Sequence, residues 1–354
     1  MKPLLASTPD ELRVAFAAAG LPGFRAAQVA RWLFARRVRD FAAMANLPRE
    51  LRAQLALQWD TRALERLAVH VAADGTRKLV LGTRDGARIE AVLIPEGRRQ
   101  TLCVSSQIGC SLDCSFCATG RMGLGRNLRA EEIVDQALHA AELLAAEERT
   151  LTHVVFMGMG EPLLNLSSVV QAIRVLTHAE AFALSPKRIT VSTAGVVPKL
   201  AALGAAVPVR LAVSLHATTD ALRDELVPLN RRFPLASLLE ACALYPLARR
   251  DRLSFEYALL AGVNDADEDA RRLARIALDA RAKVNLIPMN EHPSSPYRRP
   301  SEARIDGFLA VLAEAGVNAT LRRSRGDDIF AACGQLGALA DGQRTATSAD
   351  AASR

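Results

Sequence analysis

Three cysteines lie within one short stretch of the chain, at Cys110, Cys114 and Cys117. Thiolates this close together repel one another unless protons or a metal neutralise their charge. The C-x3-C-x2-C spacing lets one loop point three sulfurs at a common centre, which is typical of iron–sulfur clusters. Three ligands for a cube of four irons leave one iron open to a substrate or cofactor, as at catalytic rather than structural metal sites.

Two other chemistries use clustered cysteines, and the sequence favours them less. A structural zinc ion takes four Cys or His ligands, but the loop has no histidine and the nearest other thiol is Cys103, on an expected strand. Disulfides need an oxidising compartment. Residues 1–20 do not read as a signal peptide, and no apolar stretch is long enough to span a membrane. We therefore expect a cytoplasmic protein with reduced thiols.

The composition limits the size and the partners of the protein. The chain has 354 residues, half of them hydrophobic, which allows one large domain and a small one. Lys+Arg 45 against Asp+Glu 38 gives a net charge of +7, and nearly all of the positive charge is arginine. This bias fits either an alanine- and arginine-rich genome or a phosphate-binding surface, because guanidinium groups make bidentate contacts with phosphate.

The first hundred residues change from a helical to a strand pattern. Residues 8–62 are expected to form short helices, and the strand-like segments are 68–71, 78–81, 89–94 and 101–104, with Asp-Gly turns at 74–75 and 85–86. The helical region contains Arg25, Arg31, Arg36, Arg37 and Arg39. A solvated helix face and an RNA-contacting face explain these arginines equally well.

After the cysteines, strands alternate regularly with helices. The expected strands are 152–157, 188–192, 209–215, 253–259, 283–287 and 319–321, and the expected helices are 130–146, 166–177, 235–247, 265–280 and 301–315. This order predicts an α/β fold, a partial (β/α)6-type barrel with reactive groups at the C-terminal ends of its strands. The expected parts are a helical N-terminal accessory domain at 1–65, a β-hairpin extension at 66–100, the barrel at 101–336 and a disordered tail at 337–354.

Polar or glycine-rich residues directly follow four of these strands. Those with side chains or backbone suited to a ligand are Gly160, Glu161, Ser192, Ser214, His216 and Asn290. Glycines let the backbone approach a ligand closely, and a glutamate can hold an ammonium group. Each signal is weak alone, but four such strand ends around one cysteine loop predict a shared site.

Three further cysteines lie outside the triad. Cys333 stands beside a glycine near the end of the chain, which suits a nucleophile on a mobile loop, although a free cysteine is often only a small buried residue. Cys242 lies on the apolar side of an expected helix and is interpreted as core. Cys103 faces away from its apolar neighbours, and taken alone it is also interpreted as core, with the cavity as the alternative.

Several segments together resemble a known family. The cysteine triad and residues 157–165, 192–198, 214–230, 285–290 and 325–336 are similar to the RlmN/Cfr family of radical S-adenosylmethionine RNA methyltransferases. The resemblance runs from about residue 90 to residue 336, and the N-terminal helices resemble the small RNA-binding domain of that family. The triad alone would indicate only the wider radical superfamily, whereas Ala-Ala-Cys-Gly-Gln-Leu at 331–336 is the specific segment.

The resemblance implies a role for each matched residue. Cys110, Cys114 and Cys117 are expected to ligate one 4Fe–4S cluster, whose open iron holds S-adenosylmethionine. The residues expected to bind that cofactor are Gly160, Glu161, Ser192, Ser214, Leu215, His216 and Asn290. Cys333 is expected to accept and carry the methyl group, Cys103 to resolve the adduct, and Glu90 to accept a proton.

The resemblance also implies the reaction and the partners. The expected product is adenine methylated at carbon 2, in 23S rRNA and in tRNA next to the anticodon, with two S-adenosylmethionine molecules per methyl group and an electron donor such as flavodoxin or ferredoxin. Methylation at carbon 8 of 23S rRNA and a radical enzyme with a non-RNA substrate stay open. A non-catalytic iron–sulfur RNA-binding protein would have no use for Cys103 and Cys333. One position departs from the family pattern, because Phe330 replaces an acidic residue.

Overall fold

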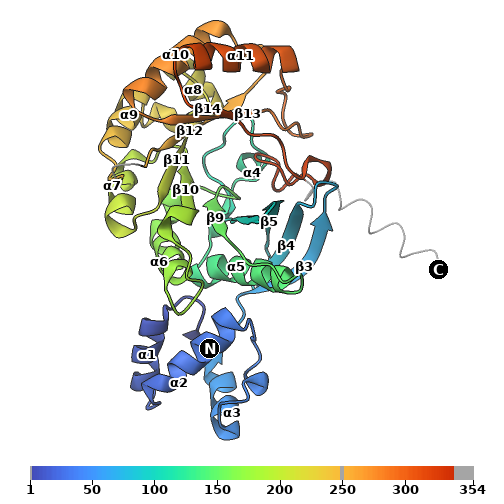
Figure 1. Ribbon diagram of the computed structural model, residues 1–354, viewed down its shortest axis with the longest axis vertical. Helices are drawn as coiled ribbons and strands as arrows, with labels where there is room; N and C mark the ends of the chain where they lie inside the picture. The colour runs from blue at the N-terminus through green and yellow to red at the C-terminus, as the bar shows by residue number, and fades with distance from the viewer. Residues whose placement is uncertain (1, 248–250, 339–354) are drawn as a thin grey trace, which may run out of the picture.

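A mixed ten-stranded sheet forms the body of the protein (Figure 1). The computed structural model describes residues 2–247 and 251–338. From one edge to the other, the strands are β14 (Ala319–Leu321), β13 (Lys283–Pro288), β12 (Ser254–Leu259), β11 (Arg210–Ser214), β10 (Ile189–Thr193), β9 (His153–Phe156), β6 (Arg99–Cys103), β5 (Arg88–Glu96), β4 (Arg77–Thr83) and β3 (Leu64–Val71). Figure 1 shows helices along the outer side of the curved sheet and the N-terminal helices at its lower end.

Every neighbouring pair of strands from β14 to β6 is parallel. The helices that connect them are α5 (Ala130–Ala145), α6 (Leu166–Thr177), α7 (Val197–Ala206), α8 (Asp220–Leu226), α9 (Leu235–Ala243), α10 (Asp267–Asp279) and α11 (Glu302–Glu314). This arrangement confirms the predicted partial barrel. β12 is buried along nearly its whole length, because helices cover one face of a parallel sheet and the barrel interior covers the other.

The expected hairpin extension is a three-stranded antiparallel unit that continues the barrel sheet. β3 pairs with β4, β4 with β5, and β5 with β6. Gly75 and Gly86 in the two turns both have φ of 81°, a left-handed conformation that explains the Asp-Gly pairs. The register places Val92 of β5 opposite Cys103 of β6, so the extension forms one wall beside that thiol.

The N-terminal part consists mainly of α1 (Pro9–Ala18), α2 (Gly23–Ala30) and α3 (Arg49–Gln58). A capping box starts α1, since Thr8 accepts from the backbone N–H of Glu11 while the Glu11 carboxylate accepts from the N–H of Thr8. A buried ion pair joins this part to α5, where a guanidinium nitrogen of Arg39 lies 2.6 Å from Asp135 Oδ1. The helices therefore hold a defined position against the barrel.

Some elements differ from those expected. The sequence pattern did not predict α7 or α8, and it missed two small sheets, one pairing β1 (Lys2–Pro3) with β2 (Trp59–Asp60) and the other pairing β7 (Gln107–Gly109) with β8 (Leu124–Asn127). Of the expected tail, Gly337 and Ala338 form a turn, and residues 339–354 lie outside the described residues. The helices in the described part of the chain all fall short of the length and apolar character that crossing a bilayer requires.

Candidate active site

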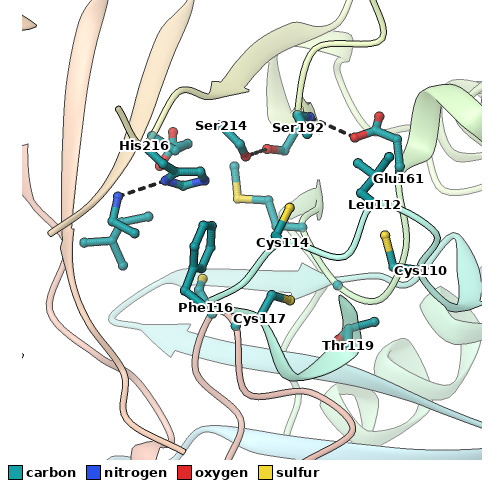
Figure 2. A pocket seen from close by; sticks show the side chains of 18 of the residues that line it. Cys110, Leu112, Cys114, Phe116, Cys117, Thr119, Glu161, Ser192, Ser214 and His216 are labelled. Atoms are coloured by element: carbon teal, nitrogen blue, oxygen red, sulfur yellow. Dashed lines mark hydrogen bonds between the residues drawn. The ribbon is translucent and has the colours of Figure 1, made fainter. Parts of the chain in front are cut away.

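A pocket opens at the C-terminal ends of the parallel strands, where barrel geometry predicts one. The cysteine loop after β6, the ends of β9, β10, β11 and β13, and Cys333 all contribute to its wall. Figure 2 shows the triad cysteines around one side of this space and Ser192, Ser214 and His216 on the other. The expected cofactor residues that line it are Gly160, Glu161, Ser192, Ser214, His216 and Asn290.

The cysteine loop is closed at its base by the β7–β8 ladder. The N–H of Cys110 donates to Gly123 O over 2.9 Å, and the N–H of Cys117 donates to Cys114 O over 3.1 Å. Burial raises the pKa of the Cys110 thiol to about 11 and also raises the pKa of Cys114 and Cys117, with the neighbouring thiols adding to the effect. Three thiolates here therefore need a cationic centre to stabilise them.

The pocket wall around the three thiols suits an iron–sulfur cluster. Each of three thiolates can bind a different iron of a cubane cluster, which leaves the fourth iron open. Leu112 and Phe116 line the same pocket and give it an apolar wall. Within the described residues, no three His, Cys, Asp or Glu side chains converge closely enough to hold one metal ion.

Gly160 and Glu161 lie in the loop after β9 and line the pocket. Gly160 has φ of 94°, and a Cβ there would lie 2.4 Å from Gln107 Cβ, so only glycine fits. The buried Glu161 carboxylate accepts from the N–H groups of Leu163 at 2.9 Å and Ala194 at 2.8 Å, and burial raises its pKa. Within the described residues no ion pair neutralises Glu161, so a ligand ammonium would find a pre-positioned partner.

His216 is held in one tautomer at the end of β11. Its Nδ1 accepts from the N–H of Ala258 at 2.9 Å, which leaves the hydrogen on Nε2. Burial lowers the pKa of His216 to about 3, and the ring contacts Phe116 edge-on with centroids 4.7 Å apart. Leu215 differs from the other expected residues, because its side chain lies in the hydrophobic core and only its backbone is at the strand end.

Cys333 lies between two cavities. It lines the pocket of the cysteine triad and also a second cavity, which it shares with Cys103, Val92 and Ile94. The Cys333 side chain is exposed to water, but it lies in a concave site where the surrounding protein displaces part of the solvent and raises the pKa of the thiol. The charge of nearby Arg322 partly offsets that rise. Burial raises the pKa of Cys103 to about 12. The two thiols that the sequence resemblance singled out thus face one cavity.

Comparisons with known proteins agree with this geometry. Family models match residues 104–274 as the Radical SAM superfamily and residues 3–59 as a Ribosomal RNA large subunit methyltransferase N-terminal domain. The Dual-specificity RNA methyltransferase RlmN of Syntrophobacter fumaroxidans is 50% identical, covering 90% of this chain and 92% of that protein. The one from Marinomonas sp. is 46% identical, covering 94% and 92%. The chain belongs to the RlmN family of radical SAM RNA methyltransferases.

A solved structure supports the same assignment. The crystal structure of a radical SAM methyltransferase from Sphaerobacter thermophilus is 45% identical, with a TM-score of 0.92 over 96% of this chain and 100% of that chain. Membership of the radical SAM superfamily implies an iron–sulfur cluster and S-adenosylmethionine as cofactors. The pocket described above is the place in this RlmN-family chain whose residues fit both.

Glu90 lies on β5, on the same face as Val92 and Ile94 of the second cavity. Its carboxylate accepts from the N–H of Gly337 over 2.9 Å and lies 3.3 Å from Lys78 Nζ. Lys78 Nζ also donates to the carbonyl of Phe330 over 3.4 Å. Phe330 has φ of 51°, a left-handed conformation that an aromatic residue rarely adopts.

Sequence reasoning missed Arg223, which supports the pocket from behind. This arginine of α8 is almost fully buried. Its guanidinium donates to the carbonyls of Leu215 at 3.0 Å, Ala194 at 2.6 Å and Ser214 at 3.1 Å, and to Asn230 Oδ1 at 2.9 Å. It therefore ties together the ends of β10 and β11, which carry the pocket-lining Ser192 and Ser214. An arginine in a short charged helix reads as a surface residue, so the pattern held no signal for it.

Proposed function

We propose that this RlmN-family chain methylates carbon 2 of adenine in 23S rRNA and in tRNA, by way of a methylated Cys333. The observation that carries the proposal is that Cys333 lines both the cofactor pocket and the cavity that contains Cys103. A thiol in this position can receive a methyl group on one side and present it to a base on the other. The curated relatives carry the name dual-specificity RNA methyltransferase, which supports an RNA substrate.

The pocket residues divide between the two cofactors. Cys110, Cys114 and Cys117 would hold the cluster, while Glu161 would bind the amino group of S-adenosylmethionine because its buried carboxylate lacks a cation. The residues that would surround the rest of S-adenosylmethionine are Gly160, Ser192, Ser214, Leu215 through its backbone, His216 and Asn290. With an electron from a donor such as flavodoxin or ferredoxin, two S-adenosylmethionine molecules supply an electrophilic methyl group and a hydrogen-abstracting radical.

The chain's own groups would handle the carbon once it has been transferred. The Cys333 sulfur would take the methyl group and lose its thiol proton, and that methyl group would then lose one hydrogen atom to the radical from the second S-adenosylmethionine. The resulting carbon radical would add to carbon 2 of adenine. Glu90 would then take the proton from carbon 2 while the ring returns one electron to the cluster, and the two losses together would restore the aromatic ring. The thiolate of Cys103 attacks the sulfur of Cys333, so that a disulfide forms as the sulfur–carbon bond breaks, and the departing carbon takes up a proton.

The second cavity carries charges that suit a nucleic acid. Arg322, Arg323 and Arg325 line it together with the two cysteines. Guanidinium groups beside a methyl-carrying thiol would hold the phosphates that flank a target base. Asn290 fixes the approach of the thiol, since its side-chain amide donates to Cys333 O over 2.9 Å.

Mass spectrometry of nucleosides from rRNA and tRNA, in cells with and without this protein, tests the proposal directly. We expect 2-methyladenosine to disappear without the protein and to return when it is restored. The Cys333→Ala variant should fail to restore it, whereas Cys242→Ala, which changes a buried helical cysteine away from both cavities, should succeed. Finding 8-methyladenosine instead would move the reaction to carbon 8, and finding no change in either would overturn the proposal.

The role of Cys103 has a separate test. Without the resolving thiol, the Cys103→Ala variant should accumulate a covalent protein–RNA adduct through Cys333. The adduct should be absent from the Cys103→Ala/Cys333→Ala double variant. Release of methylated RNA by Cys103→Ala at the normal rate would remove Cys103 from the mechanism.

A further inference from the structure

A further hollow, larger than the two cavities described above, lies away from the active site, between the N-terminal helices and the antiparallel strands. Four segments wall it: residues 37–39, residues 62–66 leading into β3, residues 82–84 at the end of β4, and α5. The charged side chains that line it are Arg37, Arg39, Arg62, Glu65, Arg66, Arg84 and Glu142. Arginines thus outnumber glutamates, and neither the cofactors nor the methyl transfer proposed above makes use of them.

Only some of these arginines are neutralised by the protein itself. Arg39 pairs with Asp135 and Glu142, and Arg84 pairs with Asp60. Arg37, Arg62 and Arg66, by contrast, form no ion pair within the described residues. Arg62 and Arg66 are also exposed, so their charges face the hollow at little cost in desolvation. The hollow therefore keeps a positive charge that an anion can neutralise.

Arg37 adds a further observation that points to a ligand. It lies just after a short helical segment, Arg31–Ala35, and lines the hollow. Arg37 Nε is buried and has no hydrogen-bond partner among the described residues. An oxygen atom of a bound ligand would satisfy that donor.

The β3–β4 hairpin connects this hollow to the methyl-carrying segment. Its ladder runs from Leu64 opposite Thr83, at the hollow, to Val71 opposite Arg77. At its far turn, the N–H of Ala73 donates to Asp328 Oδ2 over 2.9 Å. Eight residues of β3 span roughly 25 Å. A ligand that fills the hollow and also reaches Cys333 must therefore be much longer than one nucleotide.

We propose that this hollow, the junction groove, binds the phosphate backbone of the folded RNA substrate at a point remote from the target base. The inference rests on the proposed function, and it adds where the RNA is held. Arginine suits this task because its planar guanidinium makes bidentate contacts with phosphate. Phosphate contacts of this kind fix register and orientation without reading sequence, which would let one enzyme accept both rRNA and tRNA.

Binding measurements across a salt series test the junction groove. The full chain, the double variant Arg62→Gln/Arg66→Gln and the matched double variant Arg271→Gln/Arg275→Gln would be titrated with intact tRNA and with a short anticodon stem–loop. Arg271 and Arg275 are exposed on α10, far along the chain from the groove. Thermal unfolding would confirm that all three proteins are folded.

We expect the groove variant to bind intact tRNA roughly tenfold more weakly and to lower the slope of log K against log salt by about 1.5–2, as loss of two phosphate contacts predicts. The groove variant should lose less affinity for the stem–loop, because that RNA does not reach the groove. An unchanged slope, or an equal loss in the α10 variant, would overturn the inference. Failure of the unmodified chain to bind any RNA would instead overturn the proposed function.

Discussion

Lys78 Nζ lies 3.3 Å from Glu90 Oε1, and the two residues occupy the neighbouring strands β4 and β5. The Lys78 side chain is only 1% exposed, so this ammonium serves the protein interior and not solvent. It also donates to the carbonyl of Phe330, three residues before Cys333. Lys78 thus connects the proposed base to the segment that carries the proposed methyl acceptor.

Lys78→Met should affect both stability and proton transfer. The variant leaves a buried carboxylate without its cation, and breaking a buried pair typically costs about 3–5 kcal/mol. The Glu90 carboxylate would also lose the contact that positions it, so removal of the proton from carbon 2, and with it resolution of the RNA adduct, should slow. Lys78→Arg should restore much of the rate, and Lys283→Met provides an exposed control. Normal stability and a normal rate of adduct resolution in Lys78→Met would show that the pair has no such role.

Replacing any one triad cysteine should remove the cluster. Cys110→Ala, Cys114→Ala and Cys117→Ala each leave only two thiolates on the loop, and we expect protein purified without oxygen to lose its brown colour and most of its iron. Iron and sulfide analysis with visible spectroscopy measures this, and Cys242→Ala is the matched control. A colourless, zinc-loaded parent protein would contradict the assignment of all three ligands.

Gly160→Ala should disrupt the pocket while sparing the barrel. The added Cβ would meet Gln107 at 2.4 Å in a backbone conformation that alanine disfavours. The loop must shift, and Glu161 moves with it, so we expect S-adenosylmethionine binding to fall by at least about tenfold, equivalent to about 1.4 kcal/mol. Calorimetric titration would measure the loss. Gly262→Ala, at a left-handed turn with open space around it, controls for backbone strain alone; equal affinity in both variants would argue against the close approach.

Acidification should weaken the contact between α5 and the N-terminal part. Burial, with the charges of Arg39 and Arg66, lowers the pKa of His139 to about 4, although Glu142 acts in the opposite direction. A histidine whose folded pKa lies below its unfolded value loses stability as pH falls through 6.5 toward 4. Between pH 7 and pH 5 this loss amounts to about 2 kcal/mol. Denaturant unfolding at both pH values measures it.

The matched variants for this prediction are His139→Gln and His178→Gln. The first should remove the His139 share of the pH dependence, while the second changes a histidine that pairs with Asp10 near the surface and leaves the buried contacts of His139 intact. Burial also lowers the pKa of His216, and its contribution to the pH dependence of stability is the same in both variants. If His139→Gln unfolds with the same pH dependence as the parent, the histidine is not the acid-sensitive group.

Long periodic segments were predictable from the sequence, and short ones were not. The helix expected at 166–177 has the bounds of α6, because apolar residues recur along it at helical spacing. α8 has only seven residues, too few to establish a period, and its burial depends on what packs over it. For the same reason Arg223 escaped notice: only the tertiary structure shows that backbone carbonyls surround it.

Cys103 also shows what a local sequence pattern can predict and what it cannot. Alternation with Leu102 and Val104 correctly indicated which way Cys103 faces, but it held no information about what lies there. The shared cavity arises because β5 lies beside β6 and residues 325–333 fold back over both. Pairings so distant in sequence depend on the whole topology, so the resemblance, and not the local pattern, pointed to Cys103.

β14 and β3 are the two edges of the sheet, yet the chain after β14 returns to the turn between β3 and β4, where Gly326 N donates to Asp74 and Ala73 N to Asp328. That strip of chain bridges the gap which the incomplete ring of strands leaves open. On the proposed mechanism, a base would enter past this segment, which also leads to Cys333, the proposed methyl carrier. A substitution in it is therefore expected to change both the entry of the base and the transfer of the carbon.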